Sequence, residues 1–427
     1  MNIEMERLGT EKSAIRELFE QGKILKEKYG DENVFDFSLG NPCVPCPKKV
    51  NDTLIHLLTI SELIDKSTDN IASHPLFDND DNDDNETNYR YLNSTMLHGY
   101  TSAQGDKGVR DVISEYLNKT YNAKTNSDLI YMTSGAAAAL TITLKALTSG
   151  NENDEVIVFA PYFPEYQVFI KNANAKMVTV KPDLKTFYPD LEDFKQKINS
   201  STTAVMINSP NNPTGVLYNE NVIKDICNIL RDKEKEFNHP IYIISDEPYR
   251  ELIYVDEKYP FITNYYDNSV ITYSFSKSIS LPGERIGYIL VNPNAENSKN
   301  VYAAICGAGR SLGYVCATTL FQFLIPHILG LTSDISVYKN NAELFSRELR
   351  DIGYEVIKPD GAFYLFVKSP IEDEKEFSRE ALKHNLLIVP SESFGVKGYV
   401  RLAYCVREKQ IKDSIIKFKE LYNFYNQ

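Results

Sequence analysis

Residues 270–291 read VITYSFSKSISLPGERIGYILV. Two short runs rich in Val, Ile and Tyr, Val270–Phe275 and Arg285–Val291, flank a turn that holds several serines and one lysine, Lys277. Short runs of this kind, without strict polar alternation, are typical of strands that are buried on both faces of a sheet. We therefore predict two buried strands, with Lys277 just past the end of the first.

Three runs further upstream have the same character: Glu155–Ala160, Thr203–Asn208 and Ile241–Asp246. Helix-like segments such as Asn221–Lys235 separate several of them. Strands that alternate with helices predict an α/β domain in which helices sandwich a mainly parallel sheet. Ligands of such domains bind beyond the carboxyl ends of the strands, so we expect the functional residues at that edge.

Changes in residue pattern indicate how the chain is divided. We expect residues 1–50 to be an N-terminal segment that packs with a small domain, and residues 51–325 to form a large domain. Residues 63–93 are rich in Asn and Asp, and we expect them to be a mobile or loosely packed insertion. A long helical pattern over Ala303–Leu331 leads into residues 326–427, which we expect to form the small α+β domain.

Charge and cysteine content exclude several classes of protein. The 427 residues include 46 Lys and Arg against 59 Asp and Glu, which argues against a nucleic-acid or membrane binder, since both need a basic surface. Part of the excess of acidic residues comes from the run Asp78–Glu86, which we interpret as a solvated insert.

The polar residues Met1–Thr10 and the six cysteines predict a cytoplasmic protein with reduced thiols. Cys43 and Cys46 form a CxxC sequence, but no second ligand pair is nearby, so we expect no metal site.

Lys277 is the first candidate for chemistry. A lysine that is partly removed from water and close to another cation becomes an amine nucleophile able to form a Schiff base. Arg285 offers a planar guanidinium suited to a phosphate, and Ser274 and Ser276 add hydroxyl donors on the same turn. Taken alone, Lys277 could equally be a surface lysine in a serine-rich turn.

Gly135, Ala136 and Ala137 open a predicted helix, whose free backbone N–H groups favour a phosphate. The small side chains let an anion approach closely. Such a segment is more often a helix that simply packs on a sheet. Its combination with Lys277 and Arg285 favours the phosphate site.

Asp246 ends a very apolar predicted strand, where an unpaired carboxylate is costly. The protonated ring nitrogen of pyridoxal phosphate would pair it, and a helix N-cap is the alternative. The turn at residues 208–215 brings amide donors to the same edge of the sheet. Phe163 follows another strand, where its ring could stack on a flat cofactor.

The motifs together resemble those of the class I/II aminotransferases, which are fold-type-I pyridoxal phosphate enzymes of the aspartate aminotransferase superfamily. The resemblance extends over nearly the whole chain and implies a large α/β domain, a smaller α+β domain and a homodimer with shared active sites. The matching segments are SLGNP at 38–42, NNPTG at 211–215, DEPY at 246–249, SFSKSISLPGERIG at 274–287 and YVRLA at 399–403.

The resemblance also implies roles for individual residues. Lys277 would be the Schiff-base and proton-shuttle residue, Asp246 would hold the ring nitrogen, and these two with Tyr249 would form the catalytic set. The residues implied to bind the cofactor are Lys277, Asp246, Tyr249, Asn212, Phe163, Gly135, Ala136, Ala137, Ser274, Ser276, Arg285 and, from a neighbouring subunit, Tyr100. The residues implied to bind the substrate are Arg401, which would hold the α-carboxylate, with Gly40, Asn212 and Arg310.

Arg310 falls where some relatives that use dicarboxylic amino acids place an arginine that reaches into the partner's site, and a surface or interface ion pair is the alternative. The implied reaction is transamination between an L-amino acid, such as aspartate or alanine, and a 2-oxo acid. A lyase, synthase or decarboxylase with the same cofactor stays open, because a fold does not fix a reaction. A non-catalytic cofactor-binding module is a third possibility, for which a basic helix-turn-helix should precede the domain. The sequence does not identify the amino donor or the acceptor.

Overall fold

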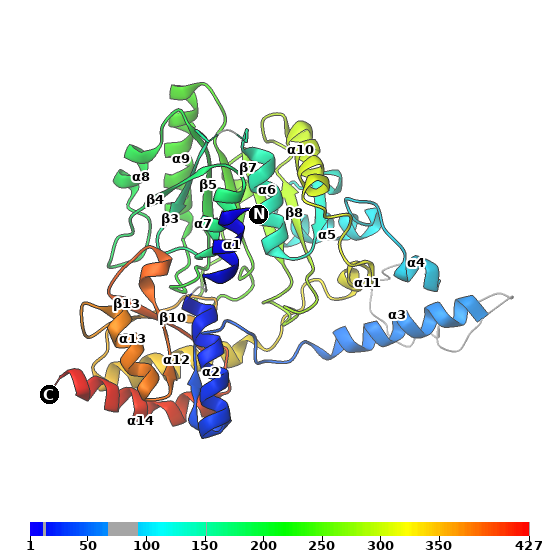
Figure 1. Cartoon of the computed structure of the whole chain (residues 1–427). Coiled ribbons are helices and arrows are strands. Elements are labelled where there is room, and N and C mark those ends of the chain that lie inside the picture. Colours follow the sequence, from blue (N-terminus) through cyan, green and yellow to red (C-terminus); the bar gives the residue numbers. More distant parts are fainter. Residues whose placement is uncertain (12–13, 67–92, 151, 427) are drawn as a thin grey trace.

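The computed structural model describes residues 1–11, 14–66, 93–150 and 152–426 (Figure 1). The strands of these residues form a large sheet, a small sheet and one pair of short strands. Residues 67–92, which include the acidic run and most of the predicted insertion, lie outside the described residues. Among the residues described, no helix combines the length and the apolar character that crossing a membrane requires.

The large sheet has the strand order β2-β8-β7-β6-β5-β3-β4. Neighbouring strands from β7 to β4 are parallel, whereas β8 runs antiparallel to both β7 and β2. The predicted α/β class with a mainly parallel sheet is therefore confirmed. The strands are β2 (Ile130–Thr133), β3 (Glu155–Phe159), β4 (Lys176–Val180), β5 (Thr202–Asn208), β6 (Tyr242–Asp246), β7 (Ser269–Ser274) and β8 (Gly287–Val291).

Two details of this sheet differ from the sequence-based expectation. The edge strands β2 and β4 were not predicted, because β2 has only four residues and most side chains of β4 are partly exposed. Arg285, expected to open β8, lies two residues before it in a left-handed backbone conformation, with φ of 52°. The arginine therefore belongs to the turn that holds Lys277.

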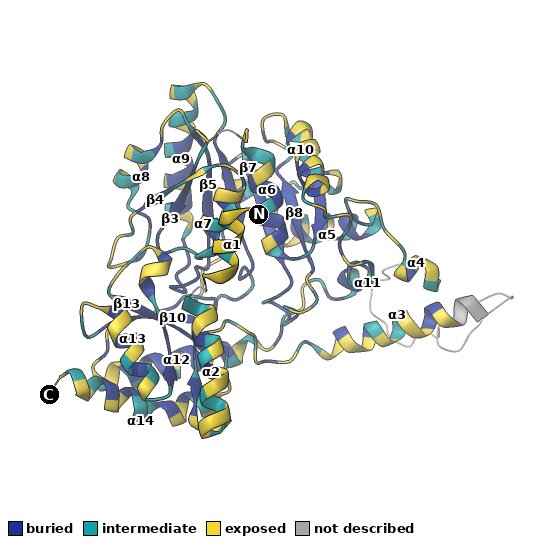
Figure 2. Ribbon diagram, viewed as in Figure 1, coloured by how far each residue is buried: buried dark blue, intermediate teal, exposed yellow. Residues whose placement is uncertain are grey.

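Successive side chains of a strand point to opposite faces of the sheet, and each face of the large sheet has its own helices. Helices α6, α7 and α10 cover one face, here called the α6 face, and α5, α8 and α9 cover the other, the α9 face. Figure 2 shows the buried strands between helices whose outer surfaces are exposed. The helices are α5 (Lys107–Tyr121), α6 (Ala136–Leu147), α7 (Glu165–Asn172), α8 (Leu191–Lys197), α9 (Glu220–Phe237) and α10 (Ser298–Ser311).

The small sheet has the order β12-β13-β10-β9 and is antiparallel. A short strand near the N-terminus, β1 (Phe35–Asp36), pairs in parallel with β11 (Leu386–Leu387), and Phe35 shares a hydrophobic core with the C-terminal helices. Helix α2 (Ala14–Tyr29) lies beside this unit (Figure 1). The remaining elements of the unit are β9 (Val356–Ile357), β10 (Tyr364–Lys368), β12 (Val389–Pro390), β13 (Tyr399–Ala403), α12 (Ile335–Ile352), α13 (Glu374–Lys383) and α14 (Glu408–Tyr425).

The continuous helical pattern expected over Ala303–Leu331 is wrong. Helix α10 ends at Ser311, and Gly313 follows with φ of 83°. A short helix, α11 (Thr319–Leu324), then passes into a 3₁₀ turn at Ile325–His327. Pro326 and Gly330, the latter with φ of 82°, break the helical repeat, because proline lacks the N–H donor and glycine tolerates positive φ.

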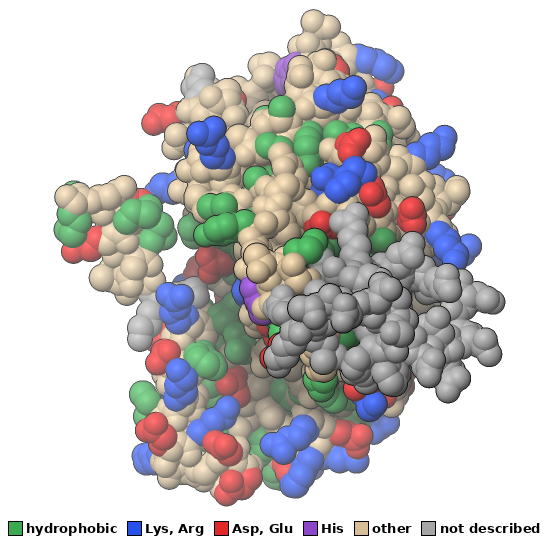
Figure 3. Space-filling model, turned by 90° about the vertical axis from the view of Figure 1, so that its right-hand side faces the viewer, with side chains coloured by type: hydrophobic (Ala, Val, Ile, Leu, Met, Phe, Trp, Pro, Cys, Tyr) green, Lys and Arg blue, Asp and Glu red, His purple; other side chains and the backbone are tan. Residues whose placement is uncertain are grey.

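Three helices lie on the outside of the molecule: α1 (Ile3–Thr10), α3 (Lys48–Lys66) and α4 (Ser94–His98). Figure 1 shows α3 extending away from the body, and Leu57 on α3 packs against Leu97 on α4. On the face drawn in Figure 3, basic and acidic side chains are interspersed over the residues shown in colour.

Candidate active site

Lys277 lies in the turn after β7, at the carboxyl end of a central strand. Its Nζ donates a hydrogen bond to the carbonyl oxygen of Gly40 at 2.7 Å and lies 5.4 Å from the ring centre of Phe363. Burial lowers the pKa of Lys277 to about 8, and the positive charges of Arg401 and Arg285 act in the same direction. With a pKa of about 8, roughly a tenth of this amine is neutral, and so nucleophilic, at pH 7, which is far more than for an ordinary lysine.

Asp246 is the last residue of β6 and is buried. Its Oδ2 accepts a hydrogen bond from the hydroxyl of Tyr166 at 2.5 Å, whereas its Oδ1 has no partner within the described part of the chain. Burial raises the pKa of Asp246 to about 7, and the nearby Glu247 adds to the shift. The helix N-cap reading is not supported, because no helix begins at this residue.

Phe163 lies in the loop between β3 and α7, on the same face of the sheet as Asp246. Its ring packs edge-on against Tyr166, with the ring centres 5.7 Å apart. Tyr166 therefore links the aromatic ring expected over the cofactor to the carboxylate expected at its nitrogen.

The predicted phosphate site is brought together by the ends of β2, β7 and β8. Gly135, with φ of 82°, precedes α6, and a Cβ built there would lie 2.7 Å from Nη2 of Arg285. Ser274 and Ser276 are buried and share a hydrogen bond of 2.6 Å between their hydroxyls. Ala136 and Ala137 form the first turn of α6, whose N–H groups have no partners inside the helix. The positive φ favours a glycine at 135, and any side chain there would displace the guanidinium of Arg285.

Arg401 on β13 is buried in the small sheet and reaches toward the large one. Its Nη1 donates to Oδ1 of Asn212 at 3.1 Å, and its Nη2 donates to the carbonyl oxygen of Ser38 at 2.5 Å. The guanidinium lies over the rings of Tyr364 and Phe394, 4.7 and 5.1 Å from their centres. Among the described residues no carboxylate pairs with it, and its Nε has no hydrogen-bond partner.

Tyr249 connects these groups from the turn after β6. Its hydroxyl lies 2.9 Å from the hydroxyl of Tyr364, and burial raises its pKa. Gly40 packs so tightly on Tyr364 that a Cβ at Gly40 would lie 2.1 Å from the phenol oxygen. Asn212, Tyr249, Gly40, Lys277 and Arg401 thus form one cluster between the two sheets.

Two of the predicted residues lie apart from this cluster and from the groups around Asp246 and Arg285. The side chain of Tyr100 is 90% exposed, just beyond α4, and Arg310 is exposed near the end of α10. The resemblance assigns both of them to the site of a second subunit. Their positions within one chain do not test that assignment.

Several residues around these groups were given no individual role by sequence reasoning. Tyr166 and Tyr364 contact Asp246 and Arg401, and Asn208 holds the turn of Asn212 by accepting its backbone N–H at 2.8 Å. Tyr166 lies three residues after Phe163, so its position near the predicted site could have been inferred from the sequence. The position of Tyr364 could not, because it depends on how the small sheet faces the large one.

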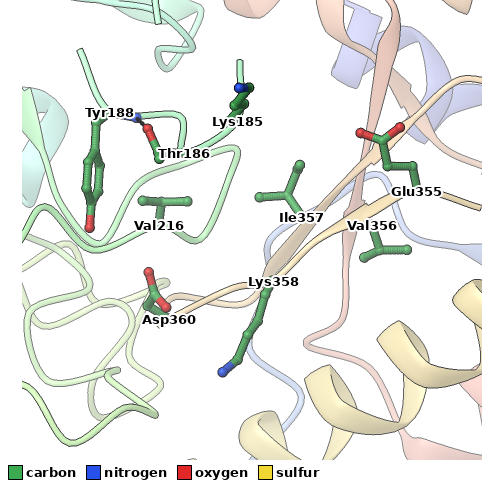
Figure 4. A pocket seen from close by; sticks show the side chains of 9 residues that line it. All are labelled: Lys185, Thr186, Tyr188, Val216, Glu355, Val356, Ile357, Lys358 and Asp360. Atoms are coloured by element: carbon green, nitrogen blue, oxygen red, sulfur yellow. Dashed lines mark hydrogen bonds between the residues drawn. The ribbon is translucent and has the colours of Figure 1, made fainter. Parts of the chain in front are cut away.

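A separate cavity of about 410 Å³ lies along the exposed edge of β9 (Figure 4). Figure 4 shows Tyr188, Lys358 and Asp360 among the side chains around it. None of the predicted site residues lines this cavity, and we assign no chemistry to it.

Comparison with known proteins identifies the family of the chain. A family model described as aminotransferase class I and II matches residues 80–416. The chain belongs to this family. The predicted family and the enzyme class, a transferase, are therefore confirmed.

Individual relatives within the family are similar over most of their length. The chain is 30% identical to a probable aspartate aminotransferase of Methanocaldococcus jannaschii over 78% of this chain and 88% of the relative. It is 31% identical to a probable aspartate/prephenate aminotransferase of Aquifex aeolicus, over 87% and 96% of the two chains. The crystal structure of an aminotransferase from Eubacterium rectale has 47% identity and a TM-score of 0.90, and covers 100% of this chain and 99% of that chain.

Proposed function

We propose that this aminotransferase uses pyridoxal phosphate to exchange an amino group between an L-amino acid, such as aspartate or alanine, and a 2-oxo acid. The observation that carries the proposal is Arg401, a buried guanidinium without a carboxylate partner among the described residues, close enough to Lys277 to affect its pKa. A buried cation without a counter-charge is costly. A substrate α-carboxylate would supply that charge.

The residues present fit pyridoxal phosphate. Oδ1 of Asp246 is a buried acceptor without a donor among the described residues, which suits a protonated ring nitrogen. Gly135 leaves room beside the guanidinium of Arg285 and precedes free N–H groups of α6, which suits a phosphate. Ser274 and Ser276 would add hydroxyl donors, Phe163 would stack on the ring, and Asn212 and Tyr249 would bind its oxygen.

When bound, this cofactor withdraws electrons from the α-carbon of the amino acid. The protein's part is to hold the substrate and to move a proton. Arg401 fixes the α-carboxylate, and Nζ of Lys277, when neutral, can take the proton from the α-carbon and return it. Asp246 keeps a negative charge at the ring nitrogen, and the aromatic walls formed by Tyr364 and Phe394 limit access of water to Arg401.

The role of Arg401 is tested by replacing it with lysine and with glutamine. Glutamine removes the charge, so kcat/KM for an amino acid should fall by roughly 30- to 150-fold, about 2–3 kcal/mol. Lysine should be intermediate, because it keeps the charge but not the paired donors. The comparison substrate is an amine of the same side chain without the carboxylate. Its slow reaction should be unchanged, and an equal loss for both compounds would contradict the role.

We also propose a homodimer, in which Tyr100 reaches the phosphate in its partner's site. Its 90% exposed side chain and the exposed apolar Ile55 and Met96 on α3 and α4 support this. Light scattering at assay concentration should give twice the mass of the chain, and Tyr100→Phe should weaken cofactor binding. An active monomer would contradict the shared site.

Arg310 is proposed to bind the distal carboxylate of a dicarboxylic donor from the partner subunit. The names of curated relatives as aspartate aminotransferases support such a donor. In Arg310→Ala, kcat/KM for aspartate should fall by about 2 kcal/mol or more while that for alanine is unchanged. Equal effects on the two donors would show that Arg310 is only a surface or interface residue.

The division into an N-terminal segment, 1–50, a large domain, 51–325, and a small domain, 326–427, is likewise proposed. Two hydrophobic clusters support it, one built mainly from the large sheet and its helices and one built mainly from the C-terminal unit. Phe35 and Phe37 of the first segment belong to the core of the C-terminal unit, as expected for a segment that packs with the small domain.

A further inference from the structure

Two residues of the proposed cofactor site on the large sheet have a neighbour in sequence whose side chain lies on the opposite face of the sheet. Asp246 and Ser274 lie on the α6 face, whereas the adjacent Glu247 and Tyr273 lie on the α9 face. This follows from the alternation of side chains along a strand. The α9 side of the strand ends therefore forms an underside to the proposed active site.

The centre of this underside is Arg250, which is buried in the turn after β6. Its guanidinium pairs with Glu247 at 3.0 Å and Glu251 at 3.2 Å. Nη2 donates to the hydroxyl of Tyr288 at 3.1 Å, and the ring centre of Tyr273 lies 4.2 Å from the guanidinium carbon. The four partners come from three segments that also carry proposed active-site residues.

One branch of this network ends beside the reactive lysine. Oε1 of Glu251 accepts a hydrogen bond from the hydroxyl of Tyr273 at 3.0 Å, and that hydroxyl lies 3.0 Å from Oγ of Ser278. Ser278 is buried and directly follows Lys277. Its carbonyl oxygen also accepts two hydrogen bonds from Ser333, just before α12: the backbone N–H at 2.8 Å and the hydroxyl at 3.2 Å.

We infer that Glu251, Tyr273 and Ser278 are positioning residues, which hold the backbone of Lys277 so that its amine stays in the partly buried site beside Gly40. The proposed mechanism does not use any of the three, and none of them touches the proposed substrate site. The inference rests on the proposed function only in taking Lys277 as the reacting amine. Its geometry consists of hydrogen bonds among the buried Tyr273 and Ser278 and the half-buried Glu251.

The hydrogen bonds from Glu251 through Tyr273 to Ser278 should affect the pKa of the Lys277 amine. When the hydroxyl bridge is removed, the turn can move and Nζ of Lys277 can reach more water. Burial then disfavours the charged amine less, so the pKa of Lys277 should rise toward the ordinary value of a lysine. The other titratable groups that act on Lys277 are Arg285, Arg401 and Cys405, and the substitutions below leave all three unchanged.

The test uses Tyr273→Phe and Ser278→Ala, each of which removes one hydroxyl, and the double variant. Tyr288→Phe is the matched control, because it removes a hydroxyl from the same network that is bonded to Arg250 and not to the lysine turn. The full chain, freed of cofactor, is labelled with acetic anhydride at a series of pH values. Mass spectrometry of the Lys277 peptide gives the midpoint of its reactivity, and thermal unfolding compares the stabilities.

Tyr273→Phe and Ser278→Ala should each move the Lys277 midpoint upward by about half a pH unit or more, which is about a threefold change in the neutral fraction. The double variant should match the larger single effect, because both changes break the same bridge. Tyr288→Phe should leave the Lys277 midpoint unchanged, even if it lowers the unfolding temperature as much as Tyr273→Phe or Ser278→Ala does. The inference is overturned if the midpoints of all variants stay at the wild-type value, or if Tyr288→Phe shifts it equally. This readout needs no cofactor, so its failure is distinct from failure of the proposed function.

Discussion

Lys277→Ala should abolish turnover, with kcat lowered by more than about 10³-fold. General acid–base groups contribute about 10²–10⁴ to a rate, and this substitution also removes the amine nucleophile. The control is Lys195→Ala, which removes an exposed lysine on α8, and its activity should equal that of the wild type. The measurement is single-turnover amino transfer at saturating amino acid. A Lys277→Ala enzyme that keeps a tenth of the wild-type rate would refute the assignment.

Asp246→Ala should lower kcat by roughly 10²–10³-fold, as expected when a charge is removed from a preorganised site. Asp246→Asn keeps the volume and removes the charge, so it should lose nearly as much. Tyr166→Phe removes only the hydrogen bond to Oδ2 and should cost about tenfold or less, about 1 kcal/mol. Steady-state kinetics of the three variants distinguish charge from packing. If Asp246→Asn stays within tenfold of the wild type, the carboxylate is only structural.

The positions of Lys277 and Asp246 could be predicted because Asp246 ends one buried strand and Lys277 lies in the turn after another. A parallel sheet brings such residues to one edge, so the order of motifs along the chain was enough to place them. Ser274, Arg285 and Gly135 were predicted for the same reason. In the structure Ser274 bonds to Ser276, and Gly135 lies beside the guanidinium of Arg285.

Contacts between distant segments could not be predicted in this way. Two examples depend on how the small sheet meets the large one. Tyr364 packs on Arg401, and that arginine donates a hydrogen bond to the carbonyl oxygen of Ser38. The network around Arg250 was also missed, because nothing local indicates that its charge is buried. The break after Ser311 was missed for another reason: the apolar residues after it keep a helical spacing that Gly313 and Pro326 interrupt.

The central claim is that Lys277 forms the covalent link to pyridoxal phosphate. The most direct measurement is reduction of the purified, cofactor-loaded protein with borohydride, followed by digestion and mass spectrometry of the peptides. The account predicts that the visible absorption is lost and that the peptide containing Lys277 carries the mass of the reduced cofactor. Cofactor attached to a different lysine, or no covalent cofactor after reduction of an active preparation, would contradict it.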